Sequence, residues 1–201
     1  MKLVKLAVIA SVVVLTGCAS SGNSSKNYSS SNGQQKDVWE RIRKGLKMPD
    51  LQDDRVEYWT NYYAARPASV QIMAQRSSKY IHYITQELER RNMPTELALL
   101  PFVESAYNAK AVSSAKAAGL WQFIPSTGTH YNLTQDWWKD ERRDPVQSTH
   151  AALNYLSYLH GFQDNDWHLA LASYNWGEGA VKRARERNAS TGLGTDYLSL
   201  K

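Results

Sequence analysis

Cysteine is almost absent from this sequence of 201 residues, since Cys18 is the only one and no internal disulfide can form. The same shortage excludes a metal site built from several cysteines. The five histidines include no His-Glu-x-x-His pair, and no glycine-rich phosphate loop is present. We therefore expect no metal and no cofactor.

Acidic residues are missing from the first 36 positions, which makes the overall charge of +5 misleading. All 19 acidic residues lie from Asp37 onward together with 20 of the 24 basic ones, so this part carries a net charge of only +1. A nucleic-acid-binding domain needs a strongly basic surface. The basic run at 182–187 is typical of a solvated helix face, and we expect no nucleic-acid partner.

The one long apolar run lies at the start of the chain. Lys2 and Lys5 precede an almost unbroken apolar segment at 6–15, which is typical of a secretory signal. The alternative is a transmembrane anchor, but the run is shorter than the roughly 20 residues that span a bilayer. We expect a signal peptide at 1–17.

Cys18 follows Leu15-Thr16-Gly17, and this segment resembles the bacterial lipoprotein signal. The resemblance implies that Cys18 is lipid-modified and becomes the mature N-terminus. A free thiol and an intermolecular bridge are the alternatives. Because aspartate after the cysteine favours the inner membrane in such proteins, Ala19 implies an outer-membrane lipoprotein that faces the periplasm.

The composition divides the rest of the chain. Residues 18–36 are rich in Ser, Asn, Gly and Gln and predict a flexible tether. About 165 residues follow with a globular composition, enough for one domain with an extension. We expect a helical extension at 37–89 and a catalytic domain at 90–201.

Strand signals are scarce and helix signals are plentiful, so we expect an all-α fold. Asp144-Pro145 is typical of a helix start, and Gly161 is the expected stop. Asp166 predicts a second start, with an end near Gly177. The expected apolar stripe of the first helix is Val146, Leu153, Leu156 and Leu159.

Three further helical regions are expected in the first half of the chain. The region 38–63 predicts one or two short helices, and 69–91 predicts one longer helix with Ile72, Ile81 and Ile84 in the core. Pro94 opens another helix, which Pro101 should kink or break because proline lacks the N–H group.

Glu104 is the first candidate for chemistry. It ends the strongly apolar run 97–103. A solvated glutamate at a helix end is one interpretation. The other is a carboxyl group that its apolar neighbours partly desolvate, which raises its pKa toward the range that general acid catalysis requires.

Three sequence blocks extend this candidate: Glu104-Ser105, Gly119-Leu120-Trp121-Gln122 and Tyr174-Asn175, with Ser113 between the first two. Together they resemble the lytic transglycosylases of goose-type lysozyme-like fold. The resemblance covers 80–201 well and 37–79 more loosely. It implies an all-α, lysozyme-like catalytic domain of the transglycosylase SLT type with an N-terminal helical extension.

The resemblance also implies a role for each matched residue. Glu104 corresponds to the catalytic acid, and Ser113 to a serine that contacts the sugar. Gly119 to Gln122 correspond to a motif that lines the cleft, with Gln122 binding substrate. Tyr174 and Asn175 correspond to a pair that faces the acid across the cleft. The motifs also have aromatic neighbours that offer faces for sugar rings: Tyr107, Trp121, Tyr131 and Trp176.

The implied reaction cleaves the β-1,4 bond between N-acetylmuramic acid and N-acetylglucosamine in peptidoglycan without water and leaves 1,6-anhydromuramyl ends. Most glycosidases use two carboxylates, but the matched motifs contain only Glu104. Glu178 and Asp144 are nearest, and we expect both to serve at helix starts. The alternatives are a peptidoglycan-binding lipoprotein without turnover and a hydrolytic muramidase.

The expected partners are peptidoglycan glycan strands and the outer membrane, which the lipid on Cys18 would enter, and we expect a monomer. Members of this family usually continue well beyond the position where this sequence ends, at Lys201. The chain is therefore expected to be either a fragment or a short variant.

Overall fold

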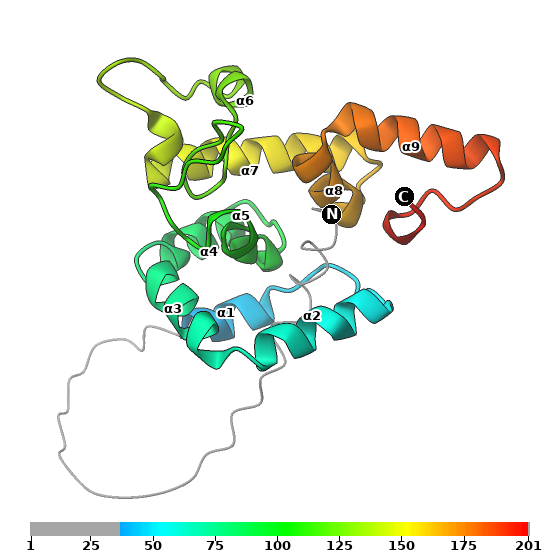
Figure 1. Cartoon of the computed structure of the whole chain (residues 1–201), viewed down its shortest axis with the longest axis horizontal. Coiled ribbons are helices and arrows are strands. Elements are labelled where there is room, and N and C mark those ends of the chain that lie inside the picture. The colour runs from blue at the N-terminus through cyan, green and yellow to red at the C-terminus, as the bar shows by residue number, and fades with distance from the viewer. Residues whose placement is uncertain (1–36, 201) are drawn as a thin grey trace, which may run out of the picture.

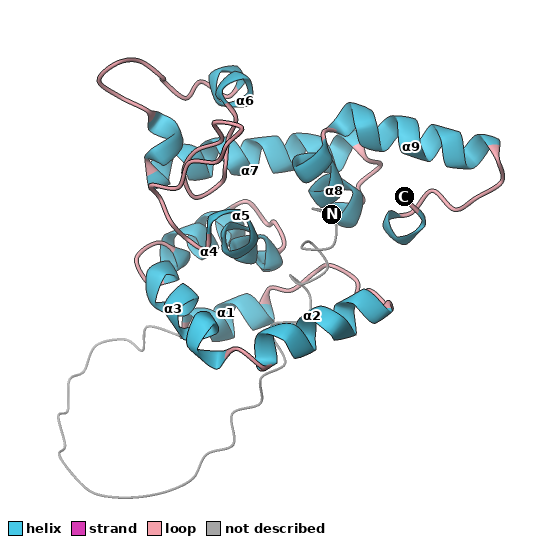
Figure 2. Cartoon of the chain, in the orientation of Figure 1, coloured by secondary structure: helices cyan, strands magenta, loops and turns pink. Residues whose placement is uncertain are grey.

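The computed structural model describes residues 37–200, and every regular element in that range is a helix (Figures 1 and 2). The expected signal peptide, tether and Cys18 lie outside the described residues. The all-α expectation is confirmed. The α-helices are α1 (Val38–Lys44), α2 (Asp54–Ala64), α3 (Pro67–Ser77), α4 (Ile81–Arg90), α5 (Leu100–Ser105), α6 (Pro125–His130), α7 (Pro145–Phe162), α8 (Trp167–Trp176) and α9 (Glu178–Ser190). Short 3₁₀ helices are η2 (Thr95–Leu99), η3 (Glu141–Arg143) and η4 (Tyr197–Ser199).

Aspartate side chains cap the N-termini of α7 and α8, as the sequence predicts. Asp144 accepts hydrogen bonds from the backbone N–H groups of Val146 and Gln147, and Asp166 accepts one from Leu169. Each bond satisfies a donor that the first helical turn leaves without a partner. The expected end of α7 at Gly161 is wrong by a residue or two, because the helix continues to Phe162. Val146 is also exposed, since its place in the first turn of α7 faces solvent.

The expected single helix at 69–91 is wrong, because α3 and α4 are separate. The hydroxyls of Ser77 and Ser78 donate to the carbonyls of Ala74 and Gln75, both at 2.8 Å. Such bonds compete with the helical backbone pattern and favour a turn there. Ile81 and Ile84 are buried in α4 as expected, whereas Ile72 is half-exposed.

Proline at 101 has the expected effect on the segment that leads to Glu104. The chain forms the 3₁₀ helix η2 and then restarts as α5, with Pro101 in the first turn. There its missing N–H costs nothing, because the first turn has no acceptor for it. The break therefore precedes the proline and leaves Glu104 on a helix of only six residues.

One large core joins the early helices to the late ones. Apolar side chains of α1, α4, η2, α5 and α7 form one buried cluster that includes the fully buried Trp121. The Trp121 indole N–H donates to the Thr149 hydroxyl at 3.0 Å, so its polar group is satisfied. A smaller cluster joins α8, α9 and η4. Within residues 37–200, no helix is long and apolar enough to cross a bilayer.

The α1 segment is fastened to η2 by polar contacts. The Thr95 hydroxyl donates to the Ile42 carbonyl at 2.7 Å. The buried carboxylate of Glu96 accepts from the backbone N–H groups of Lys47 and Met48, both at 2.7 Å. Glu96 therefore anchors the loop that leaves α1 to the element that leads to Glu104.

Glu96→Ala should lower the free energy of unfolding by about 1–2 kcal/mol, because two backbone donors lose a charged acceptor. Urea denaturation measures this loss. Glu57→Ala on α2 is the control, since Glu57 is exposed and its loss should change stability by less than about 0.5 kcal/mol. Equal stability of the two variants would show that the Glu96 contacts contribute nothing.

Candidate active site

A cavity of about 610 Å³ brings together all five residues that the sequence nominates as a site. In the sequence these residues are widely separated, because Glu104, Ser113 and Gln122 lie within 19 positions and Tyr174 and Asn175 follow about 50 positions later. These residues come from α5, from the loop between α5 and α6, and from the last turn of α8. The structure thus places them in one cavity; their individual roles stay predictions.

Glu104 is held half-buried near the end of α5 by its neighbours. The Ser105 hydroxyl donates to the Leu120 carbonyl at 2.9 Å, and the buried Tyr107 hydroxyl donates to the Ala98 carbonyl at 2.6 Å. Ala106 and Tyr107 both have positive φ, so the chain turns away sharply after α5. The carboxylate therefore sits at a helix end whose position is fixed from both sides.

The loop between α5 and α6 forms the wall that contains Gln122. Its amide nitrogen donates to the Gly119 carbonyl at 2.9 Å, which leaves the amide oxygen as the available acceptor. Gly119 has a φ of +81°, and a Cβ there would lie 1.8 Å from the carbonyl oxygen of Arg142. Only glycine fits this close approach. Ser113 also shapes the loop, because its hydroxyl accepts from the Ala117 N–H at 3.1 Å.

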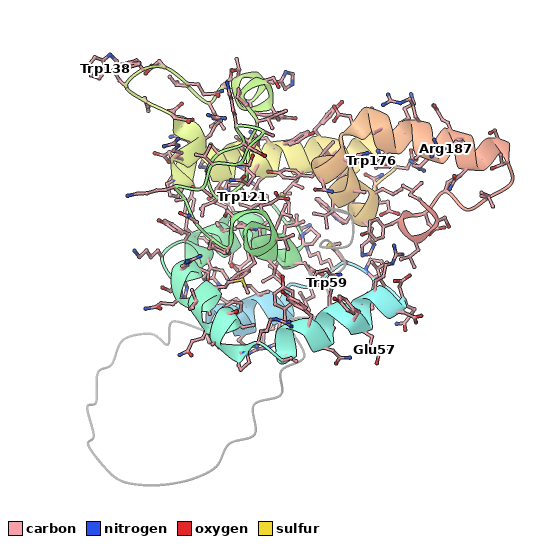
Figure 3. The ribbon with its side chains drawn as sticks, viewed as in Figure 1. Glu57, Trp59, Trp121, Trp138, Trp176 and Arg187 are labelled. Carbon is pink, nitrogen blue, oxygen red and sulfur yellow. The ribbon has the colours of Figure 1, made fainter. Side chains whose placement is uncertain are left out.

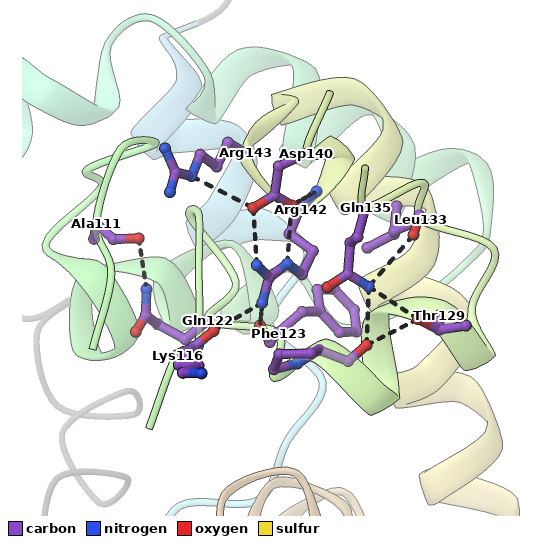
Figure 4. A network of polar contacts seen from close by, with 12 residues as sticks. Ala111, Lys116, Gln122, Phe123, Thr129, Leu133, Gln135, Asp140, Arg142 and Arg143 are labelled. Atoms are coloured by element: carbon purple, nitrogen blue, oxygen red, sulfur yellow. Dashed lines mark hydrogen bonds and ion pairs between the residues drawn. The ribbon is translucent and has the colours of Figure 1, made fainter. Parts of the chain in front are cut away.

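A buried arginine, Arg142, ties this loop to the following segment (Figure 4). Its guanidinium pairs with Asp140 through two bonds, of 2.9 Å and 2.8 Å. A third nitrogen donates to the carbonyls of Lys116 and Phe123, at 2.8 Å and 3.1 Å. Sequence reasoning missed Arg142, because nothing local distinguishes it from its neighbour Arg143.

Tyr174 of α8 also lines the cavity. Its hydroxyl donates to the Trp121 carbonyl at 2.7 Å, and its ring contacts those of Tyr155 and Phe123. Burial raises the pKa of Tyr174 well above the usual value, and the nearby charge of Glu104 raises it further. Tyr174 is therefore a neutral phenol whose proton is donated to the Trp121 carbonyl, and its oxygen can still accept a hydrogen bond from a ligand.

The cavity contains a second carboxylate that the sequence analysis assigned only to a helix start. Glu178 does begin α9, but it also lines the cavity, and its carboxylate accepts a hydrogen bond from the Tyr155 hydroxyl at 3.2 Å. Burial, followed by the charge of Glu178, raises the pKa of Tyr155. Asp144, the other carboxylate considered, caps α7 as expected.

The aromatic neighbours of the motifs divide between core and cavity. Trp121 and Tyr107 are buried in the core, and Tyr131 packs on it, so none of the three lines the cavity. Trp176 lines the cavity and is partly exposed, as a sugar-binding face requires. Of the four aromatic residues that lie near the motifs in the sequence, only Trp176 lines the cavity.

The cavity lining contains two carboxylates and no lysine, arginine or histidine. The lining residues are Val103, Glu104, Ser113, Ala115, Ala117, Gln122, Phe123, Ile124, Thr127, Tyr155, Tyr174, Asn175, Trp176, Gly177 and Glu178. Among residues 37–200, no group of three or more His, Cys, Asp or Glu side chains could hold a metal ion. Carboxyl groups can donate or accept protons, while the hydroxyls, amides and rings suit a neutral polyhydroxylated ligand.

Arg142→Ala should destabilise the chain by about 2–3 kcal/mol, because the partly buried Asp140 carboxylate loses its two guanidinium bonds and two loop carbonyls lose their donor. Hydrogen exchange should also accelerate at the Ala118 and Phe123 amides, which bond to each other's carbonyls within this loop. Arg143→Ala is the control, since that side chain is half-exposed and reaches Asp140 only at 3.6 Å. Unchanged exchange in Arg142→Ala would contradict the anchoring role.

Comparison with known proteins relates the chain to enzymes of one family. The family model described as the transglycosylase SLT domain matches residues 82–194. The chain is 38% identical to membrane-bound lytic murein transglycosylase D of Escherichia coli (strain K12), over 96% of this chain and 48% of that protein. It is 47% identical to a protein named for tributyltin chloride resistance from Alteromonas sp. (strain M-1), over 54% of this chain and 53% of that protein.

A third relative is membrane-bound lytic murein transglycosylase C of Glaesserella parasuis, at 31% identity over 60% of this chain and 37% of that protein. The chain spans about half the length of the first two relatives. The family match itself covers more than half of the chain and includes every residue of the predicted site. The chain therefore belongs to the family with the transglycosylase SLT domain, whose fold is all-α and lysozyme-like.

Proposed function

We propose that the chain is a lytic transglycosylase that cleaves peptidoglycan glycan strands between N-acetylmuramic acid and N-acetylglucosamine. The observation that carries this proposal is the convergence of Glu104, Gln122, Tyr174 and their neighbours on one cavity. Membership of the SLT family and the names of its lytic murein transglycosylase relatives support the choice of substrate.

Glu104 would act first as a general acid. It donates its proton to the glycosidic oxygen, the bond to the muramyl C1 breaks, and the N-acetyl group stabilises the positive charge that develops at C1. Glu104, now a carboxylate, takes the proton of the muramyl C6 hydroxyl as that oxygen bonds to C1. The proton count balances, Glu104 is restored, and the product is a 1,6-anhydromuramyl end formed without water.

The other cavity residues suit binding and orientation. Tyr174 offers an oxygen acceptor because its proton is donated to Trp121. Gln122 offers its amide oxygen for the same reason, since its nitrogen is engaged by Gly119. Ser113 and Asn175 add polar groups for sugar hydroxyls and acetamido groups, and Trp176 adds a ring face.

A hydrolytic muramidase is the second candidate, and Glu178 is the observation that favours it. A hydrolase needs a second carboxylate to activate water or to attack C1. Glu178 lies in the same cavity as Glu104. Its bond from Tyr155 and its place at the start of α9 give it a structural use, so we prefer the mechanism with one acid.

We also propose that the chain is an outer-membrane lipoprotein that faces the periplasm and acts as a monomer. The lipoprotein-like segment that ends at Cys18 supports the anchor. The membrane-bound relatives support membrane association. Because each buried CH₂ contributes about 0.8 kcal/mol, two or more acyl chains on Cys18 would hold the protein stably.

Glu104→Gln should reduce turnover of purified glycan strands by at least about 10²–10⁴-fold, because the amide fills the site but cannot donate a proton. Glu178→Gln is the matched control and should retain most of the activity. Mass analysis of the wild-type products should find anhydromuramyl ends, which are one water lighter than hydrolysed ends. Reducing muramyl ends, together with an equal loss in Glu178→Gln, would establish the hydrolase instead. An active Glu104→Gln chain would remove the proposed function.

Cys18→Ser should release the chain from the membrane fraction or stall its processing, because the acceptor of the acyl chains is lost. Cell fractionation followed by immunoblotting measures the effect. Ser20→Ala is the control, as it changes a hydroxyl next to the site and keeps the cysteine. Normal maturation and outer-membrane fractionation of Cys18→Ser would contradict the anchor.

A further inference from the structure

Two adjacent tryptophans project from the tip of a short hairpin between α6 and η3. Trp137 and Trp138 are 90% and 91% exposed, whereas the next most exposed large apolar residue among 37–200 is Leu193 at 62%. Figure 3 places Trp138 at the far end of this hairpin, pointing away from the domain. Single exposed apolar residues are ordinary, but two neighbouring and almost fully exposed indoles form an apolar patch of the kind that marks a binding site.

Hydrogen bonds hold the backbone of the tip that carries the two indoles. The Asp136 carboxylate accepts from the N–H groups of Trp138 and Lys139, both at 2.8 Å, and the Asp136 N–H donates to the Lys139 carbonyl at 2.8 Å. At the base, the Thr134 N–H donates to the Glu141 carboxylate at 2.7 Å. A fixed backbone reduces the ordering cost of binding, as rigid aromatic contacts do at other binding surfaces.

Polar contacts connect the hairpin to one wall of the cavity (Figure 4). Asp140 at its base pairs with Arg142, which in turn holds the Phe123 carbonyl. Gln135 donates to the Pro125 carbonyl at 2.9 Å and to the Thr129 hydroxyl at 3.1 Å, so the hairpin is fastened to α6. The neighbouring residues Phe123, Ile124 and Thr127 line the cavity. The backbone that carries the indoles is therefore linked by hydrogen bonds to the wall of the cavity.

Charge distinguishes the kinds of ligand that this tip could take. The segment 136–143 has three acidic and three basic residues and so no net charge. Each of its cations lies near a carboxylate of the same segment: Lys139 pairs with Glu141 at 2.6 Å, Arg142 pairs with Asp140 at 2.8 Å, and Arg143 approaches Asp140 at 3.6 Å. Anionic lipid surfaces and polyphosphates attract proteins through available lysines and arginines. The tip fits a neutral ligand better.

We propose that Trp137 and Trp138 form a carbohydrate-binding platform outside the cavity, which packs against the C–H faces of neutral pyranose rings. Because this ligand is taken to be peptidoglycan glycan, the inference rests on the proposed function. A polymer that is held at the platform stays near the cavity between cleavage events, which raises its effective concentration there. The platform would contribute to the capture of long strands and not to the chemical step.

Binding to insoluble peptidoglycan tests the platform. The parent protein is the full chain with Glu104→Gln, to prevent turnover, and Cys18→Ser, to remove any lipid contribution. Adding Trp137→Ala and Trp138→Ala should weaken binding about tenfold, since two aromatic contacts are lost. Replacing both by tyrosine should restore most of the binding, because a ring face remains. Tyr58→Ala on α2, which removes another exposed aromatic, is the matched control and should leave binding unchanged.

Two further measurements separate the platform from its rivals. Unfolding midpoints should be equal in all these proteins, because the indoles are exposed. Vesicles of phosphatidylethanolamine and phosphatidylglycerol should show no binding that depends on the two tryptophans. Undiminished peptidoglycan binding by the double alanine variant would overturn the platform, and so would a loss confined to vesicles, which would identify a membrane contact.

Turnover of a soluble tetrasaccharide fragment of the glycan separates this inference from the proposed function. The chain with Glu104 intact should cleave the fragment at the same rate with and without the two tryptophans, because so short a ligand needs only the cavity. No cleavage by either protein would defeat the proposed function. Cleavage by both, together with undiminished peptidoglycan binding in the double variant, would defeat the platform alone.

Discussion

The Asp140–Arg142 pair is the interaction on which the geometry of the cavity depends. The loop between α5 and α6 has no helix and only isolated bridges, so a few backbone hydrogen bonds are all that it contributes to the position of Gln122. Arg142 supplies a further constraint by binding two carbonyls of that loop, while Asp140 fixes the orientation of the guanidinium. Gly119 permits this arrangement, since any side chain there would collide with the Arg142 backbone. The buried charge is thus neutralised and fully used, which offsets its desolvation.

Local signals in the sequence predicted much of the fold. Asp144 and Asp166 start their helices because capping is an interaction within four residues. The prediction of a single helix at 69–91 was wrong because two adjacent serines donate hydrogen bonds back to the preceding turn, where α3 ends. This signal is also local, but it is weaker than an aspartate cap. Periodicity alone does not register such competition, because serine is tolerated within helices.

The site divides in the same way. Its five motif residues were predicted because the family resemblance marks them, and the cavity contains all five. Arg142 and the cavity-facing position of Glu178 were missed, because each depends on contacts across 19 to 26 positions of sequence. Trp121 was nominated as a sugar face but is buried, since its indole fills the core and its carbonyl serves Tyr174. Spacing in the sequence cannot distinguish a ring that packs inward from one that lines a cavity.

The direction of each hydrogen bond in the cavity leaves a narrow set of roles. Tyr174 and Gln122 both donate hydrogen bonds to backbone carbonyls, and the Tyr155 hydroxyl donates to the Glu178 carboxylate. Their remaining capacity is to accept, and the raised pKa values of both tyrosines keep the phenols neutral. A ligand hydroxyl that meets these three side chains can therefore donate its proton to Tyr174 or Gln122, whereas Ser113 and Asn175 in the same cavity can also donate. No cationic side chain lines the cavity to stabilise an oxyanion, so the surroundings suit a reaction in which positive charge develops on the substrate. The glycosidic bond cleavage that we propose passes through an oxocarbenium-like state, and Glu104 becomes negatively charged in the same step because it gives up its proton.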